Sequence, residues 1–358
     1  MKILTVVGAR PQFIKAAPVS KALREARHTE LIVHTGQHYD YKMSQVFFDE
    51  LSIAEPDVNL EVGSGSQGWQ TGQILERLEK TLMAHKPDCV LVYGDTNSTL
   101  AGAVAAVKLH ISLMHVEAGL RSFNREMPEE HNRVLTDHCA DALFCPTQTA
   151  VDNLSREGII NNVHLVGDTM YDATLQFAEL ANRRSTILGD LKLESKRYLL
   201  ATVHRPYNTD VPENLHSILS AFLEIGEPIV FPIHPRTRQK ISCLGESLDF
   251  QSRTTGQLRL IDPVGYLDML VLEQNARMIL TDSGGMQKEA YFFSVPCVTL
   301  RPETEWVETV NAGWNTLVGA DRLRIVNAVS VRARPGRTPP PFFGDGRAAD
   351  HIVANLEV

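Results

Sequence analysis

The sequence predicts an α/β protein with two Rossmann-like domains, each containing a doubly wound parallel sheet covered by helices on both faces. Its 358 residues exceed the size at which one hydrophobic core usually stops growing. Short apolar β-rich runs alternate with longer segments of helical spacing, which is typical of parallel sheets with two covered faces. This alternation restarts midway along the chain, so we expect two domains with a ligand-binding cleft between them.

The elements can be read off in order. The first half has six predicted strands: Ile3–Gly8, Leu31–Gly36, Cys89–Gly94, Ile111–Val116, Ala142–Cys145 and Val163–Gly167. The second half has six more: Tyr198–Val203, Pro228–Ile233, Leu258–Ile261, Met278–Thr281, Pro296–Leu300 and Thr316–Val318. The polar, helix-like residues 168–196 predict a crossover linker. We therefore expect domains at residues 1–167 and 197–345, followed by a C-terminal helix at 346–358.

Composition excludes several classes of protein. The net charge of −8 comes without a basic stripe or a polybasic segment, so neither a nucleic acid nor an anionic membrane is expected as a partner. No apolar run approaches the length of a membrane span, and the run Ile3–Val7 is too short for a signal peptide. The five cysteines lack CxxC spacing and predict buried free thiols in a reducing compartment, the cytoplasm.

Carboxylates collect at the ends of the predicted strands in the first half. Asp95 and Glu117 each follow an apolar strand. Pro128 predicts a helix start, which places Glu129 and Arg133 four residues apart on one face. A surface ion pair is the alternative interpretation of these two residues. If three carboxylates converge on one cleft, their repulsion favours a raised pKa and proton transfer.

A second candidate is the turn that follows the strand Met278–Thr281. Ser283, Gly284 and Gly285 precede a helix-like run, and amides at a helix N-terminus suit a diphosphate. Glu289, just over one turn into that helix, could accept hydrogen bonds from ribose hydroxyls. The alternative is an ordinary turn in which Asp282 or Ser283 caps the helix.

Cationic residues follow other strands. After the first strand only Gly8 is present, so the three-glycine dinucleotide fingerprint is missing; Arg10 and Lys15 offer phosphate contacts instead. His204, Arg205 and His234 follow strands of the second half and are expected to face the same ligand. No metal-ligand spacing, nucleophile elbow or P-loop is present, so we expect neither a metal nor a cofactor.

The same residues resemble the motifs of a known family. The motifs, in order, are Gly8-Ala9-Arg10-Pro11, Gly36-Gln37-His38, Gly94-Asp95-Thr96, His115–Arg121, Pro128–Arg133, His204-Arg205 and Asp282–Gly285. Together they resemble the non-hydrolysing UDP-N-acetylglucosamine 2-epimerases over essentially the whole chain. The resemblance implies a GT-B-like architecture, a UDP-N-acetylhexosamine substrate and usually a homodimer. It also implies that Asp95, Glu117, Glu129 and His204 are the catalytic set.

The implied reaction removes the C2 proton and eliminates UDP, giving a 2-acetamidoglucal, and then re-adds UDP with the proton returned to the opposite face. Arg10, Lys15, His204 and the amides of residues 283–285 suit the departing diphosphate. The second-domain residues Arg205, His234 and Glu289, with Arg133 of the first domain, complete the expected binding set. Which carboxylate serves which face of the sugar is left open.

Three positions depart from the family pattern. Trp306 stands where many relatives carry an arginine, Tyr207-Asn208 replaces a Glu-Asn pair, and Gln73 aligns with an arginine used in allosteric activation. The Trp306 pattern also resembles the branch that epimerises UDP-2,3-diacetamido-2,3-dideoxyglucuronic acid, whose carboxylate could pair with Arg236 or Arg238. The sugar is therefore expected to be either N-acetylglucosamine or this uronate.

Three alternatives remain open. A GT-B glycosyltransferase would share the fold but would need an acceptor pocket, and it would leave the segment Pro128–Arg133 without a function. A hydrolysing 2-epimerase would differ only in letting water capture the intermediate. A non-catalytic nucleotide-sugar sensor would have no need of three convergent carboxylates.

Overall fold

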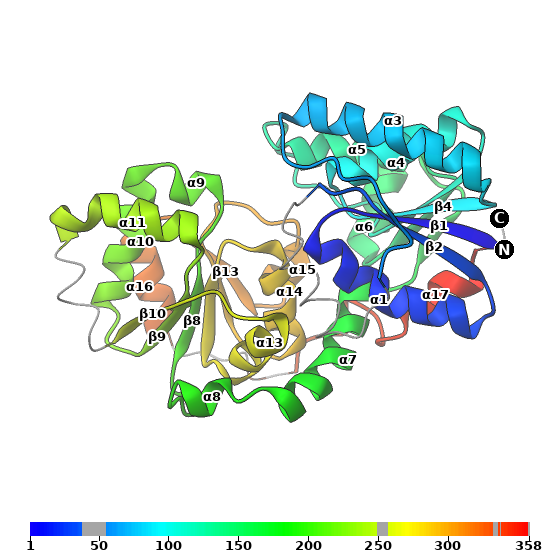
Figure 1. The fold of residues 1–358 in the computed structure, drawn as a ribbon. Coiled ribbons are helices and arrows are strands. Elements are labelled where there is room, and N and C mark those ends of the chain that lie inside the picture. Colours follow the sequence, from blue (N-terminus) through cyan, green and yellow to red (C-terminus); the bar gives the residue numbers. More distant parts are fainter. Residues whose placement is uncertain (38–54, 249–256, 332–335, 337, 357–358) are drawn as a thin grey trace. The chain divides into compact units, whose positions relative to one another are not determined.

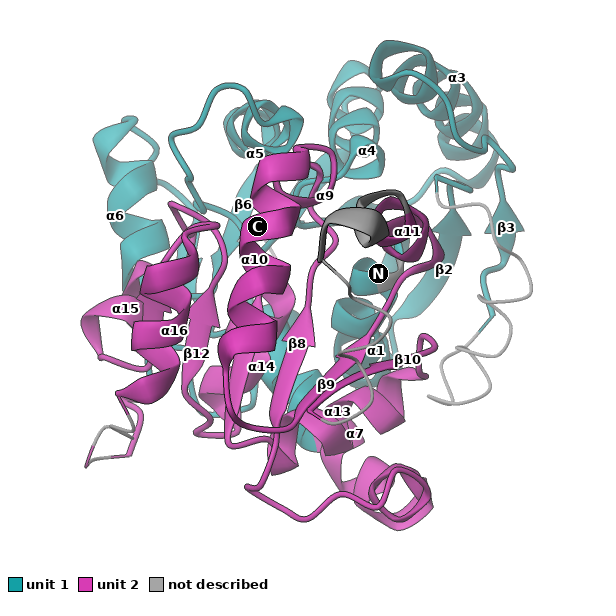
Figure 2. Cartoon of the chain, turned by 90° about the vertical axis from the view of Figure 1, so that its left-hand side faces the viewer, with its two compact units in different colours: residues 1–175, 341–358 teal, residues 176–340 magenta. Residues whose placement is uncertain are grey.

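The computed structural model describes residues 1–37, 55–248, 257–331, 336 and 338–356. It divides the chain into two compact units, shown in Figure 2. Unit 1 comprises residues 1–175 and 341–358, and unit 2 comprises residues 176–340. Each unit is built on one parallel sheet, so the predicted α/β class with two Rossmann-like sheets is confirmed.

The sheet of unit 1 has seven parallel strands in the order β3-β2-β1-β4-β5-β6-β7. Their bounds are β1 Lys2–Val7, β2 Thr29–His34, β3 Val58–Asn59, β4 Cys89–Tyr93, β5 Ser112–Val116, β6 Ala142–Cys145 and β7 Val163–Leu165. The central strand β4 is buried along its whole length, which explains its unbroken apolar sequence. The order reverses direction beside β1, the point at which doubly wound sheets bind ligands at their carboxyl edge.

Helices cover both faces of this sheet. Helices α3 (Gln67–His85), α4 (Asn97–Lys108) and α5 (Pro128–Cys139) lie on one face, and α1 (Arg10–Glu25) and α17 (Ala348–Ala354) lie on the other (Figure 1). In α3 the buried residues Ile74, Leu78 and Leu82 recur every four positions, so one apolar stripe faces the core. Helix α6 (Gln148–Arg156) follows β6, and α7 (Thr169–Arg184) crosses the division between the units.

The sheet of unit 2 has six parallel strands in the order β10-β9-β8-β11-β12-β13. Their bounds are β8 Leu199–Thr202, β9 Ile229–Pro232, β10 Leu258–Ile261, β11 Met278–Thr281, β12 Cys297–Thr299 and β13 Asn315–Leu317. Successive residues of β8 point to opposite faces of the sheet and so enter different cores. Leu199 and Ala201 pack with α10 (Pro212–Glu224) and α16 (Arg322–Ser330). Leu200 packs with α13 (Tyr266–Asn275) and α14 (Gly284–Phe292). The other helices in the described part of unit 2 are α8 Ile187–Asp190, α9 Pro206–Thr209, α11 Pro235–Leu248 and α15 Val307–Asn311.

All twelve predicted strands are present, and β3 is an additional strand of two residues. Residues 168–196, expected as a linker, form α7 and α8, and the units divide after Leu175 and again after Pro340. The C-terminal segment belongs to unit 1, where the Asp172 carboxylate accepts hydrogen bonds from the Ala348 and Ala349 amides at 3.1 and 2.8 Å. The chain therefore leaves unit 1 and returns to it.

The described cysteines carry free thiols. Cys89, Cys145 and Cys297 are buried and Cys139 is partly exposed, whereas the side chain of Cys243 lies outside the described residues. Burial raises the pKa of Cys89 to about 12, which leaves that thiol protonated and unreactive. Within the part of the chain that the structure describes, no helix is long and apolar enough to cross a membrane.

Candidate active site

Asp95 follows β4 and is held by a guanidinium group. Arg133, one turn into α5, donates from Nε and Nη2 to Asp95 Oδ2 at 3.0 and 2.6 Å. The amide of Asn132 donates to the Asp95 carbonyl oxygen at 2.9 Å. The carboxylate itself remains about one third exposed, so it is oriented by the protein and still accessible to a ligand.

Glu117 follows β5 in a conformation that L-residues seldom adopt. Its φ is +70°, and non-glycine residues in this region cluster at functional sites. Two adjacent amides fix the turn, because Glu117 and Ala118 both donate to the Phe144 carbonyl oxygen, at 3.0 and 3.1 Å. The buried Glu117 carboxylate forms an ion pair with Lys15 of α1. A side chain at Gly94 would come within 3.1 Å of this carboxylate, so Glu117 lies against the residue that precedes Asp95.

Glu129 lies in the first turn of α5 and is half-buried. The predicted spacing of Glu129 and Arg133 on the helix is present. Arg133 forms ion pairs with Asp95 and with Glu130, the latter at 2.8 Å from Nη1.

Sequence reasoning did not single out Glu130. Although burial raises the pKa of the Glu130 carboxyl, hydrogen bonds from the Ser122 amide, Arg133, the Phe123 amide and the Ser122 hydroxyl bring it below its usual range. Glu130 is therefore an anion, and it orients the Arg133 guanidinium.

A second buried network lies behind these carboxylates. The His115 ring bridges Asp137 of α5, at 2.6 Å from Nδ1, and the Gly94 carbonyl oxygen, at 2.8 Å from Nε2. Arg121 donates to Asp137 at 2.7 Å and pairs through Nε and Nη2 with Glu157, at 2.7 Å each. Neither His115 nor Asp137 was predicted as part of the site, because each lies inside a regular element where it resembles an ordinary core residue.

The loop after β1 approaches its neighbours closely. A side chain at Gly8 would come within 2.1 Å of the Ser98 hydroxyl and 2.2 Å of the Thr35 hydroxyl, so only glycine fits. The buried Gln12 side chain accepts from the Gly8 amide at 2.8 Å and donates to the Tyr93 carbonyl oxygen at 2.8 Å. This loop is thereby joined to β4, whereas the side chain of Arg10 lies outside the described residues.

In unit 2, Asp282 organises the loop that carries His204. Its fully buried carboxylate accepts from the His204 amide at 3.0 and 3.1 Å, from the Arg205 amide at 2.9 Å and from Asn208 Nδ2 at 3.0 Å. The His204 ring is 3.3 Å from Asp282 and about half exposed. Desolvation lowers the pKa of His204, the Asp282 carboxylate opposes that effect, and the nearby Arg205 and His234 add to the lowering.

The turn before α14 has the expected form. Ser283 is the N-cap, and its hydroxyl accepts from the Met286 amide at 3.5 Å. Gly284 and Gly285 open the helix and are partly exposed, so their amides can bind an anion. Asp282 is not the cap, because its carboxylate points to the His204 loop.

Trp306 lies beside Gly284, where an added Cβ would be 3.5 Å from its indole nitrogen. The Lys288 ammonium lies 4.1 Å from the centre of the Trp306 ring, a cation–π contact that is strongest where water is excluded. Trp306 and Lys288 are almost completely buried. An aromatic ring with a lysine packed on it therefore lies next to the N-terminus of α14.

Glu289 is buried and accepts from the Tyr266 hydroxyl at 3.0 Å. Beside it lies Glu273 of α13, which is fully buried; desolvation and the charge of Glu289 raise its pKa well above the usual range. The sequence did not single out Glu273, since it occupies an unremarkable helical position.

The remaining predicted basic residues of unit 2 lie near the end of β9. His234 accepts from the Arg236 amide at 3.2 Å. Arg236 pairs with Asp210 at 2.6 Å and Arg238 pairs with Asp262 at 2.8 Å. Both arginines that were expected to meet a substrate carboxylate are thus already engaged with protein carboxylates.

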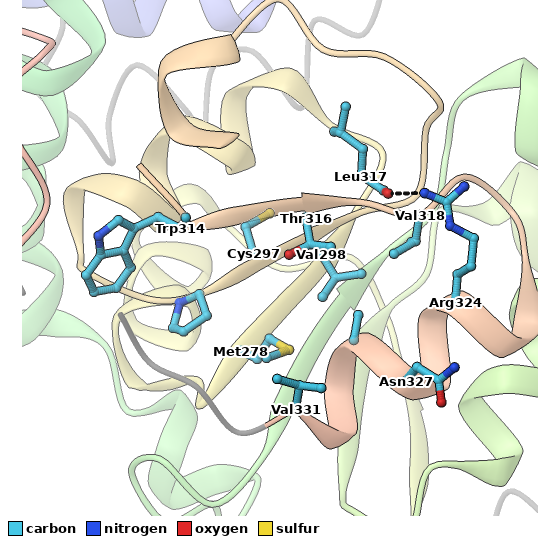
Figure 3. A pocket seen from close by; sticks show the side chains of 13 residues that line it. Met278, Cys297, Val298, Trp314, Thr316, Leu317, Val318, Arg324, Asn327 and Val331 are labelled. Carbon is cyan, nitrogen blue, oxygen red and sulfur yellow. Dashed lines mark hydrogen bonds between the residues drawn. The ribbon is translucent and has the colours of Figure 1, made fainter. Parts of the chain in front are cut away.

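A hollow of about 400 Å³ runs along β13 beneath α16 (Figure 3). Its walls include Met278, Val298 and Val331, and Arg324 at its rim donates to the Leu317 carbonyl oxygen at 2.7 Å. None of the predicted site residues lines it, so we do not assign it to the site.

The two units therefore hold different chemical groups at the carboxyl ends of their strands. In unit 1, Asp95 and Glu117 are each paired with a cation, which suits proton transfer. In unit 2, a half-exposed histidine and an open helix N-terminus suit an anion such as a diphosphate.

Comparison with known proteins gives a consistent result. A family profile described as UDP-N-acetylglucosamine 2-epimerase matches residues 21–357. A Methanococcus maripaludis protein named UDP-N-acetylglucosamine 2-epimerase homolog is 55% identical, with 99% of each chain covered. A Pseudomonas aeruginosa protein named UDP-2,3-diacetamido-2,3-dideoxy-D-glucuronate 2-epimerase is 50% identical, also with 99% of each covered. The crystal structure of Methanocaldococcus jannaschii UDP-GlcNAc 2-epimerase in complex with UDP-GlcNAc and UDP is similar with a TM-score of 0.90, at 44% identity and 99% coverage of each chain.

Proposed function

The chain belongs to the UDP-N-acetylglucosamine 2-epimerase family and is an isomerase, and we propose that it inverts C2 of UDP-2,3-diacetamido-2,3-dideoxyglucuronate without a metal or cofactor. The reaction is elimination and re-addition. The C2 proton is transferred to a protein carboxylate while the C1–O bond breaks and its electrons leave with UDP. UDP then re-forms that bond as a proton is delivered to the other face of C2.

The observation that carries the chemistry is the pair of cation-held carboxylates in unit 1. Arg133 fixes Asp95 and Lys15 fixes Glu117, so each carboxylate is oriented by a cation. Glu129, at the start of α5, completes the set of proton-transfer groups. In unit 2, His204, Arg205 and His234, with the amides of residues 283–285, bind the diphosphate, and Glu289 binds the ribose. Arg10 adds a further phosphate contact.

The choice of sugar is supported by two observations. The diacetamido-glucuronate epimerase is 50% identical to this chain, against 44% for the archaeal UDP-GlcNAc 2-epimerase of solved structure, whereas the 55% identical Methanococcus maripaludis protein is named a UDP-N-acetylglucosamine 2-epimerase homolog. The Trp306 pattern, with Lys288 packed on the ring beside the α14 N-terminus, resembles that of the diacetamido-glucuronate branch. UDP-N-acetylglucosamine is the second candidate, favoured by the family profile and by the high structural similarity to an epimerase that binds it.

NMR of the purified protein in D2O, with each UDP-sugar in turn and with a chelator present, tests this proposal. We expect epimerisation with deuterium incorporated at C2, and a higher kcat/KM for the diacetamido uronate. Retention of the original C2 hydrogen through full turnover would exclude elimination and re-addition. A clear preference for UDP-N-acetylglucosamine would refute the choice of sugar, and release of a free 2-acetamido sugar would indicate the hydrolysing reaction.

Carboxamide variants separate the proposed roles. Asp95→Asn, Glu117→Gln and Glu129→Gln should each lower kcat by about 10²–10⁴, the usual effect of losing a general acid or base. Glu126→Gln, an exposed position just before α5, is the matched control and should retain full activity. Arg10→Ala should mainly raise KM, because a phosphate contact acts on ground and transition states alike. Wild-type turnover in all three carboxamide variants would refute the assignment.

The protein is further proposed to act as a homodimer in the cytoplasm. The resemblance to the family supports the dimer, and the buried free thiols of Cys89, Cys145 and Cys297 suit a reducing compartment. Light scattering of the purified protein should give twice the chain mass of 39.8 kDa. A monomeric mass at micromolar concentration would contradict the proposed assembly.

A further inference from the structure

His115 is completely buried at the end of β5, and both of its ring nitrogens face hydrogen-bond acceptors. Nδ1 lies 2.6 Å from an Asp137 carboxylate oxygen, and Nε2 lies 2.8 Å from the Gly94 carbonyl oxygen. A neutral imidazole carries a single N–H, so it can donate to only one of these partners. The lone pair of the other nitrogen would then point at the lone pair of an acceptor oxygen in a buried site, which is strongly unfavourable.

Protonation of Asp137 would be the other way to supply the missing hydrogen, but its surroundings oppose it. The second Asp137 oxygen accepts from the Gly119 amide at 3.1 Å and from Arg121 at 2.7 Å. Both contacts, one from a backbone amide and one from a guanidinium group, favour the charged form of the carboxylate. Asp137 is therefore an anion, and the missing hydrogen belongs to the histidine ring.

The charges around the ring balance if His115 is a cation. Asp137 contributes one negative charge, and Arg121 is matched by Glu157, with two contacts of 2.7 Å. Two further titratable groups border this network. His138 is half exposed, and its Nε2 lies 3.4 Å from Glu157. Cys145 has a buried thiol whose pKa is raised by desolvation and by the Asp137 charge, so it stays neutral. A buried imidazolium facing one carboxylate is thus compensated rather than isolated.

The ring connects the three segments that carry the proposed catalytic carboxylates. Gly94, whose carbonyl oxygen it binds, directly precedes Asp95. Asp137 belongs to α5, the helix that begins with Glu129 and carries the Arg133 side chain that holds Asp95. His115 itself lies two residues before Glu117 on the same chain segment.

We propose that His115 is a doubly protonated positioning residue, whose buried imidazolium joins the Gly94 turn to α5 and thereby fixes Asp95, Glu117 and Glu129 relative to one another. The proposal rests on the proposed function for what the carboxylates do, but not for the state of the ring. His115 touches neither substrate nor reacting atoms in this scheme. Its contribution is the fixed geometry of groups that do.

The state of the ring can be tested on the wild-type protein. We expect ¹⁵N-histidine NMR to show one residue with protons on both ring nitrogens at about pH 8, where exposed histidines carry one. Loss of that signal in the His115→Asn variant would assign it to His115. A single ring N–H on the assigned residue would overturn the proposal, and this measurement remains decisive even if the variants fold poorly.

The positioning role is tested by variants that each keep one of the two bonds. An Asn amide can replace Nδ1 and still reach Asp137, and a Gln amide can replace Nε2 and still reach Gly94, but neither provides both contacts or the charge. Both His115→Asn and His115→Gln should lower kcat about ten- to hundred-fold, the effect of losing one charge-assisted hydrogen bond, with KM changed less than about two-fold. His164→Asn, a half-buried histidine on β7 of the same sheet, is the control and should leave both constants unchanged.

Wild-type kcat in folded His115→Asn and His115→Gln would overturn the positioning role, as would a rise in KM that accounts for the whole loss of kcat/KM. Failure of the proposed function gives a different pattern. The wild-type protein would then epimerise neither UDP-sugar, while the ring spectrum would still report two N–H groups.

Discussion

Substitution of Asp282 by asparagine should destabilise unit 2 and change the titration of His204. The buried carboxylate accepts from two consecutive backbone amides, those of His204 and Arg205, and from the Asn208 side chain. An asparagine of the same shape removes the charge and turns one oxygen into an NH2 group. At least one of the three donors then faces another donor.

The magnitude follows from these three contacts. A hydrogen bond to a charged group contributes about 1.5–3 kcal/mol and a neutral one about 1 kcal/mol, so weakening three bonds by about 1 kcal/mol each predicts a loss of about 2–4 kcal/mol. At roughly 2–4 °C per kcal/mol for a unit of this size, the melting temperature of unit 2 should fall by about 5–15 °C. Because Asp282 opposes the lowering of the His204 pKa, the variant should also titrate His204 at a lower pH than the wild type.

Guanidinium unfolding followed by tryptophan fluorescence measures the first effect, because two of the three tryptophans, Trp306 and Trp314, lie in unit 2. An NMR pH titration of the His204 ring measures the second. Asp262→Asn is the control, since Asp262 is 91% exposed in its pair with Arg238 and should change stability by less than about 0.5 kcal/mol. Equal stability of the two variants, with an unmoved His204 titration, would refute the reasoning.

Three further predictions follow from other positions. Gly119→Ala should lower the free energy of unfolding by about 2–4 kcal/mol, because φ is +78° and the added Cβ would lie 2.4 Å from the Ala150 carbonyl oxygen. The control Gly158→Ala, where φ is +82° but the space is open, should lower it by only about 1–2 kcal/mol in the same unfolding assay. Equal losses in the two variants would contradict the steric clash at Gly119. Burial raises the pKa of Asp172 to about 6 despite two backbone hydrogen bonds. The wild type should therefore lose stability relative to Asp172→Asn as the pH rises from about 4 to above 6. A stability difference between the two proteins that does not change with pH would refute this prediction. Initial rates should depend hyperbolically on UDP-N-acetylglucosamine, because Gln73 provides no guanidinium for an activating second molecule, and a sigmoidal curve would show the opposite.

Much of the fold could be predicted because its strands are buried on both faces. An unbroken apolar run such as Cys89–Tyr93 has few other interpretations when it lies between two helical segments. By contrast, β3 has two residues, Val58 and Asn59, and forms only because β2 provides a partner edge. No local pattern identifies a strand of that length.

The candidate site was predictable as far as strand ends determine it. Asp95 and Glu117 follow neighbouring strands, so the rule that ligands bind at carboxyl edges brings them together. The contact between Arg133 and Asp95 was not predictable, because helical spacing points only to near neighbours such as Glu129, whereas Asp95 lies 38 residues away. Asp282 likewise faces an amide 78 residues earlier, a contact that depends on how β8 and β11 pair.

The return of the chain to unit 1 determines the order in which the protein can be completed during synthesis. Unit 2 is contiguous in sequence, whereas unit 1 needs α17, whose Ala348 and Ala349 amides bind Asp172 from 176 and 177 residues further along. At translation rates of roughly 5–20 residues per second, the surface that receives α17 stays uncovered for about ten to thirty seconds after α7 is made. The second half of the protein can therefore fold before the first half is finished, and the nascent N-terminal half is the part that stays incomplete for longest.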